Sequence, residues 1–143
     1  MSDDAPETTR GARPEAARAE PPAARLLGRT VIAFDPAAGE GAFTYVAGPG
    51  FCNRHGTVQG GLLAAMLDSA TGFTFIESLG PGLTAVTREL RAQYHRPARP
   101  GVIHARARVV RNDGRDGEVH GELRDAGGQL LASAVALMRV LRR

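Results

Sequence analysis

The sequence predicts an α+β domain in which an antiparallel sheet surrounds one long apolar helix. The helix is predicted from a run rich in Leu and Ala, because Asp68 is the only charged residue between Gly56 and Ile76. Strands are predicted on both sides of it, where apolar and polar residues alternate and turn-forming residues separate the segments. A meander with one apolar helix is typical of a fold in which the sheet curls around the helix.

Two strands are expected before the helix and four after it. The first two cover residues 30–34 and 42–47, and the others cover residues 84–94, 102–109, 118–124 and 130–141. The turn residues at 112–114 and 125–128 predict hairpins. The last segment is apolar on both faces, which predicts a central strand. In the third segment Arg88 interrupts the alternation, and Val86 is expected to share a face with Leu90 and Tyr94.

The 143 residues are enough for one domain with a real core. Residues 1–22 are rich in Pro, Ala, Arg and Glu and have almost nothing to bury. We expect them to form a disordered tail, followed by a short helical turn and a single domain over residues 23–143.

Charge, cysteine content and hydropathy exclude several classes of protein. All 18 basic residues are Arg and the net charge is +3, with acidic residues interleaved throughout, so nucleic-acid binding is not indicated. A single cysteine, Cys52, excludes an internal disulfide framework. No apolar run reaches the roughly 18–20 residues of a membrane span, and the N-terminus lacks the features of a signal peptide. A cytoplasmic protein without a nucleic-acid or membrane partner is expected.

The predicted helix combines two features that suggest chemistry. Asp68 lies in the middle of the apolar run, where we expect a buried carboxylate that must be paired, hydrogen-bonded or used. The helix begins with Gly60 and Gly61, which are poor helix formers but let a ligand approach the backbone closely. The free N–H groups of such a helix terminus can bind an anion or polarise a carbonyl group.

The same stretch resembles a known family. An Asn, a Gly and a Gly-Gly pair precede the acidic residue, and a strand with Thr then ends in Tyr-x-x-Pro. This pattern resembles the PaaI-type acyl-CoA thioesterases of the hotdog fold, from about Gly28 to the C-terminus. The matching positions are Asn53, Gly56, Gly60, Gly61, Asp68, Thr87, Tyr94 and Pro97. The departure is Gln59, which stands where the family most often has His, although Gln can still donate a hydrogen bond to a carbonyl.

The resemblance implies hydrolysis of an aryl-acyl or medium-chain acyl-CoA. Asp68 would be the general base or the nucleophile, and the sequence leaves both roles open. The Gly60 N–H, with Asn53 or Gln59, would polarise the thioester carbonyl. Thr87 would orient a water molecule or support the acid, and Gly61, Arg96 and Arg99 would bind the substrate or its CoA part. Neither a metal nor a cofactor is implied.

Helix geometry predicts that the site is shared between subunits. Eight residues separate Gly60 from Asp68, which places them about 12 Å apart along the helix axis. A donor and a base that act on one carbonyl must each lie about 3 Å from it. We therefore expect Asn53 and Gly60 from one subunit to meet Asp68 and Thr87 of another. The family resemblance implies the same for a dimer, often paired into a homotetramer.

Each candidate residue also has an ordinary structural explanation. Asp68 could bond to nearby hydroxyl groups, Asn53 could be a turn residue, and Thr87 could be a simple strand former. Arg96 and Arg99 could be solvated charges, and the family pattern does not use His55. Two other functions fit the fold: a non-catalytic acyl-CoA-binding domain, and a dehydratase or hydratase, whose usual His is replaced by Gln59.

Overall fold

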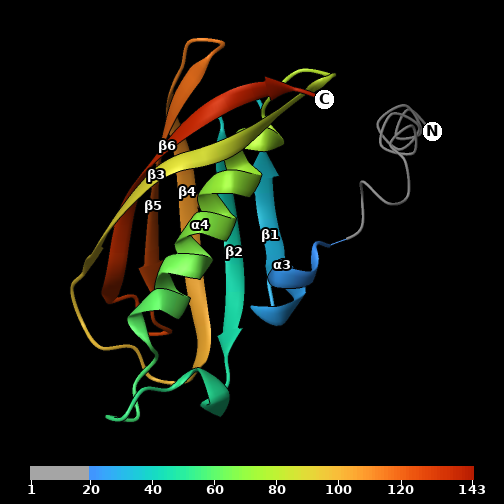
Figure 1. The fold of residues 1–143 in the computed structure, drawn as a ribbon. Helices are drawn as coiled ribbons and strands as arrows, with labels where there is room; N and C mark the ends of the chain where they lie inside the picture. Colours follow the sequence, from blue (N-terminus) through green and yellow to red (C-terminus); the bar gives the residue numbers. More distant parts are fainter. Residues whose placement is uncertain (1–19) are drawn as a thin grey trace.

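A computed structural model describes residues 20–143 and shows two helices of α type, one 3-10 turn and six strands (Figure 1). The predicted long helix is present as α4, and each predicted strand is present with bounds that differ by a few residues. The elements in chain order are α3 (Pro22–Leu26), β1 (Thr30–Asp35), β2 (Glu40–Ala47), η1 (Pro49–Phe51), α4 (Gly60–Ile76), β3 (Leu83–Tyr94), β4 (Gly101–Asn112), β5 (Asp116–Arg124) and β6 (Leu130–Arg142).

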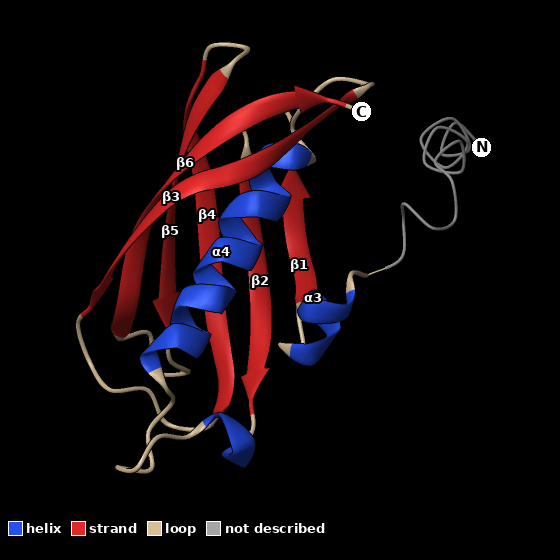
Figure 2. Ribbon diagram, in the orientation of Figure 1, coloured by secondary structure: helices blue, strands red, loops and turns tan. Residues whose placement is uncertain are grey.

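The six strands form one antiparallel sheet in the order β1-β2-β4-β5-β6-β3. The sheet curls around α4, and the helix crosses its concave face (Figure 2). This arrangement confirms the predicted α+β class with an antiparallel sheet around a central helix. Strand β6 lies between β5 and β3, so it is an interior strand as predicted, whereas β1 and β3 are the edges. The expectation that both of its faces are covered is not met within the subunit, because buried and partly exposed residues alternate along it.

One face of α4 builds the core against the sheet. Met66, Leu67 and Phe75 are fully buried there, because the apolar composition of the helix matches the Ala-rich inner face of the strands. The fit is close at Gly117 in β5, where an added Cβ would lie 2.2 Å from the Phe75 ring. Glycine is therefore required at this position by the approach of the helix. Within residues 20–143, no helix combines the length and hydropathy needed to cross a membrane.

Strand β3 contains a β-bulge between Thr87 and Glu89, which changes the face to which its side chains point. Thr87 and Leu90 are partly buried on the helix side, while Val86 is 48% exposed on the other face. The prediction that Val86 shares a face with Leu90 is therefore wrong. The extra residue, Arg88, shifts the period of two by one position.

The described structure begins at Glu20, shortly before the predicted start of the domain. Residues 1–19 of the expected tail lie outside the described residues. Glu20, however, contacts Arg29 at 3.2 Å, and α3 begins at Pro22 rather than at residue 23. An ion pair thus joins Glu20 to the residue that directly precedes β1.

A polar cluster fixes α4 against the sheet on the side of β1 and β2. The hydroxyl of Tyr45 donates a hydrogen bond to Ser69 Oγ at 2.9 Å, and Arg29 donates another to the same oxygen at 3.1 Å. The Arg29 guanidinium also lies 4.8 Å from the centre of the Phe73 ring. Because Tyr45 is fully buried, burial raises its pKa to about 12, although Ser69 and Arg29 act in the opposite direction.

The raised pKa of Tyr45 predicts a loss of stability at alkaline pH. The unfolded chain releases this proton near pH 10, whereas the folded chain keeps it up to about pH 12. Between these values the folded state binds more protons, so the free energy of unfolding should fall by about 1.4 kcal/mol per pH unit. Urea unfolding of the wild type and of Tyr45→Phe across pH 9–12 measures this term. An equal pH dependence in the two proteins would contradict it.

Candidate active site

A shallow groove between α4 and β3 contains two of the predicted catalytic residues. Its volume is about 410 Å³, and its lining combines apolar with polar and charged side chains. The residues that line it are Ala64, Ala65, Asp68, Thr87, Arg88, Glu89 and Leu90. The groove runs along the face of the helix that the sheet does not cover, beside the edge strand.

The structure brings Asp68 and Thr87 together in one chain. The Thr87 hydroxyl donates a hydrogen bond to Asp68 Oδ1 at 2.9 Å, and its oxygen also lies 3.6 Å from the sulfur of Met138. Thr87 faces the helix because it lies two residues after the buried Ala85, ahead of the point at which the bulge changes the side-chain phase of β3. One carboxylate oxygen is thus oriented by Thr87, and the other has no hydrogen-bond partner among residues 20–143.

The expectation that Asp68 is buried is wrong for a single subunit, where the residue is exposed. The sheet covers only one face of α4, and Asp68 lies on the other face beside Ala64 and Ala65. A carboxylate in this position keeps its contact with water and needs no buried partner. The acid is therefore accessible to a ligand that enters the groove, or to a second protein surface that covers it.

The helix N-terminus forms the second part of the site. Gln59 is the N-cap, but its side chain makes no capping hydrogen bond, and it is exposed. Neither the Gly60 nor the Gly61 amide has an acceptor within the described part of the chain. Two donors therefore remain free at the positive end of the helix dipole, as a site that polarises a carbonyl requires.

Tyr94 is a residue to which the sequence motif gave no role. Its hydroxyl donates a hydrogen bond to the carbonyl oxygen of Gly60 at 2.9 Å, so the end of β3 contacts the first turn of α4. The same strand contacts Asp68 through Thr87. The signal in the sequence was the Tyr-x-x-Pro ending of the strand, but spacing alone could not identify the partner of the phenol.

Asn53 organises the loop that precedes the helix. Its side-chain oxygen accepts hydrogen bonds from the amides of His55 and Thr57, at 2.9 and 3.2 Å, and its side-chain nitrogen donates one to Thr57 Oγ1 at 3.1 Å. These contacts are those of an Asx turn, which is the ordinary explanation of an Asn before glycine. Asn53 and Gln59 thus lie on the loop side of the helix terminus, at a distance from the Asp68–Thr87 pair.

The loop of Arg96 and Arg99 packs against the loop that leads into α4. The Val58 amide donates a hydrogen bond to the carbonyl oxygen of Ala98 at 2.8 Å, and Ala98 is buried. Both arginines are exposed. Their loop therefore lies next to the segment that ends at the Gly60 terminus, where exposed guanidinium groups can meet the phosphates of a ligand.

The two parts of the site lie far apart within one chain. Gly60 and Asp68 are separated by eight residues of regular helix, or about 12 Å along the axis. Strand β3 also keeps the two parts apart, because Thr87 at one contact and Tyr94 at the other are about 20 Å apart along the strand. One subunit alone cannot place both groups on the same carbonyl.

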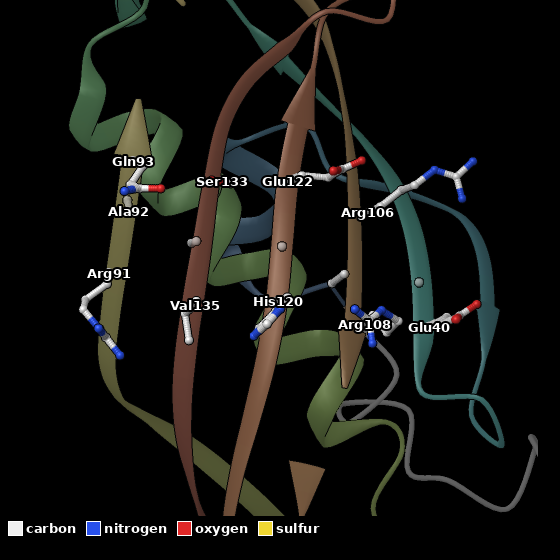
Figure 3. A pocket seen from close by; sticks show the side chains of 14 residues that line it. Glu40, Arg91, Ala92, Gln93, Arg106, Arg108, His120, Glu122, Ser133 and Val135 are labelled. Carbon is white, nitrogen blue, oxygen red and sulfur yellow. The ribbon is translucent and has the colours of Figure 1, made fainter. Parts of the chain in front are cut away.

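A larger hollow of about 900 Å³ lies on the opposite face of the sheet and contains none of the predicted site residues (Figure 3). Charged side chains dominate it, and opposite charges face one another across neighbouring strands. Glu40 pairs in register with Arg108, and Arg106 pairs with Glu122. Such cross-strand pairs explain the residues of this face through sheet stability. Its size alone therefore does not make it the active site.

Comparison with known proteins supports the assignment to a family. Residues 55–132 match the family model of the Thioesterase superfamily. A phenylacetic acid degradation-related protein of Ralstonia eutropha is 38% identical, with 87% of this chain and 94% of that chain covered and a TM-score of 0.81. No curated protein shows a significant match.

Two further solved structures share the fold. PaaI of Escherichia coli, from the phenylacetic acid degradation operon, is 22% identical, with 88% of each chain covered and a TM-score of 0.80. A Bacillus halodurans protein whose structure contains CoA is 26% identical, with 89% of this chain and 80% of that chain covered and a TM-score of 0.74. The family match, the 38% identical relative and the curled sheet together show that this chain belongs to the thioesterase superfamily, as a PaaI-like thioester hydrolase of the hotdog fold.

Proposed function

We propose that the chain hydrolyses acyl-CoA thioesters in sites that two subunits share. The observation that carries the proposal is the Thr87–Asp68 hydrogen bond at 2.9 Å in an open groove that Ala64, Ala65 and Leu90 also line. A free carboxylate oxygen in such a groove can act on a thioester whose acyl part lies against Ala64, Ala65 and Leu90. The relative from Bacillus halodurans, solved with CoA, supports a CoA ligand for this fold.

The chemistry divides between the two parts of the site. As general base, Asp68 takes a proton from water while the water oxygen attacks the thioester carbon. The negative charge that develops on the carbonyl oxygen is stabilised by the Gly60 amide, a contribution of about 3–4 kcal/mol for one donor. The C–S bond then breaks, and the CoA thiolate receives the proton that Asp68 holds. In the alternative route Asp68 attacks the carbonyl carbon directly, and the C–S bond breaks to release the CoA thiolate, which takes a proton from water. A water molecule then hydrolyses the mixed anhydride, which gives the free acid and restores the Asp68 carboxylate.

The other proposed roles follow from position. Thr87 orients Asp68, and Asn53 shapes the loop that presents Gln59 and the two glycines. Arg96 and Arg99 contact the CoA phosphates from the neighbouring loop, with Gly61 beside the ligand. The working unit is a homodimer at least, and a homotetramer if two dimers pair, because the Asp68 face of α4 is uncovered in one subunit.

Aryl-acyl or medium-chain groups are the proposed substrates. The name of the relative from Ralstonia eutropha, a phenylacetic acid degradation-related protein, supports an aryl-acyl group. The apolar part of the groove supports an apolar acyl group, because Ala64, Ala65 and Leu90 offer no hydrogen bond to a polar chain.

A panel of CoA esters tests this function. Phenylacetyl-, benzoyl-, hexanoyl-, acetyl- and succinyl-CoA are compared at equal concentration, and the released thiol is detected with a chromogenic reagent. We expect the aryl or hexanoyl esters to give the highest kcat/KM, and the charged succinyl ester the lowest. Binding of these esters without release of thiol would instead support the non-catalytic acyl-CoA-binding domain.

A further inference from the structure

The phenol of Tyr94 lies against the first turn of α4. Its hydroxyl donates to the Gly60 carbonyl oxygen at 2.9 Å, and its ring is 3.4 Å from the place where a Cβ of residue 60 would stand. The ring is 53% exposed, so this contact adds little burial. The hydrogen bond, rather than packing, is the main interaction between the end of β3 and the helix terminus.

The hydrogen bond acts on one defined peptide group. The Gly60 carbonyl belongs to the peptide that links Gly60 to Gly61, and the N–H of this peptide is that of Gly61. In a trans peptide the C=O and N–H bonds point in opposite directions, so a donor that fixes the oxygen also fixes the direction of the N–H. Hydrogen bonding at the oxygen polarises the peptide and strengthens its N–H as a donor, by about 10–30% per bond.

The preceding peptide is held by different groups. Its oxygen, that of Gln59, accepts hydrogen bonds from the amides of Leu62 at 2.9 Å and Leu63 at 3.3 Å, and its N–H is that of Gly60. The helix therefore orients the Gly60 N–H by itself. The Gly60 carbonyl oxygen also lies within α4, and besides its regular helical partner it accepts the Tyr94 hydroxyl, so the Gly61 N–H is oriented by the helix together with a side chain from β3.

We propose that Tyr94 is a positioning residue that holds the Gly60–Gly61 peptide so that the Gly61 N–H is a second donor to the thioester carbonyl. This inference rests on the proposed thioesterase function. Gly61 is exposed, and a Cβ added there would meet nothing within 4 Å. The amide also has no acceptor among residues 20–143. Among the described residues, none blocks the approach of a carbonyl oxygen to the Gly60 and Gly61 amides.

Tyr94→Phe tests the proposal because it removes the hydroxyl and keeps the ring. With the best CoA ester, we expect kcat to fall about 3- to 10-fold with KM unchanged, as for the loss of one hydrogen bond used mainly in the transition state. Gln93→Ala, the exposed neighbour on the other face of β3, is the matched control and should keep wild-type kcat. Wild-type kcat in Tyr94→Phe together with a loss in Tyr94→Leu would show that only packing matters and would overturn the proposal.

A spectroscopic measurement separates positioning from a general effect on folding. A CoA analogue with a ¹³C-labelled ketone in place of the thioester binds without turnover, and its carbonyl chemical shift reports how strongly the oxygen is hydrogen-bonded. We expect the shift in bound Tyr94→Phe to move back toward that of the free analogue. An unchanged shift would overturn the role of Tyr94, even if kcat fell. Absence of hydrolysis by the wild-type protein would overturn the proposed function instead.

Discussion

Asp68→Asn is expected to lower kcat by at least about 10²–10⁴-fold and to leave the fold intact. An amide can neither take a proton from water at neutral pH nor attack the thioester, so both possible roles of the carboxylate are lost. Its oxygen still accepts the hydrogen bond that Thr87 donates to Asp68 in the wild type. Because Asp68 is exposed in the subunit, the free energy of unfolding should change by no more than about 0.5 kcal/mol.

The measurement compares thiol release and thermal unfolding of the variant with those of the wild type. Glu118→Gln removes a carboxylate from the outer face of the sheet and serves as the matched control, with activity expected near that of the wild type. Near wild-type turnover in Asp68→Asn would show that the acid is neither base nor nucleophile. A variant that unfolds far below the wild type would show instead that Asp68 has a structural role.

The fold could be predicted because the sequence signals are local. An apolar run that begins at Gly60, followed by alternating segments between Gly-rich turns, is enough to indicate one helix within an antiparallel sheet. The bulge at Arg88 was not predictable, because a strand shows its register only against its partner β6. The exposure of Asp68 was not predictable either, because an apolar helix does not indicate which of its faces the sheet covers.

The candidate site was predicted in part. The motif spacing selected Asp68 and Thr87, and the structure places them 2.9 Å apart, although their catalytic roles stay predictions. Contacts between residues distant in sequence were missed, as with Tyr94 and Gly60, or Arg29 and Ser69. Such pairs depend on how β3 and the segment leading into β1 lie against the helix, which periodicity does not show.

The second large effect is expected from Gly60→Pro, which removes the N–H that would polarise the carbonyl. Proline is favoured at the first position of a helix, and the preceding residue, Gln59, has the extended backbone (φ −59°, ψ 134°) that proline requires. A Cβ at residue 60 would meet Tyr94 at an ordinary contact distance of 3.4 Å. We therefore expect a folded protein whose kcat is about 10²–10³-fold lower.

Activity of a mixed dimer tests the shared site most directly. Asp68→Ala and Gly60→Pro chains with different affinity tags are co-expressed, and each variant is first shown to be folded. If the chains pair at random, about half of all dimers are mixed. In each mixed dimer one of the two sites has both groups intact. About one quarter of all sites should therefore be of wild-type composition. If two subunits share each site, we expect purified heterodimers to recover about half the wild-type activity. The Asp68→Ala and Gly60→Pro homodimers should each be nearly inactive. Heterodimers that are folded but as inactive as their parents would show that each site lies within one chain.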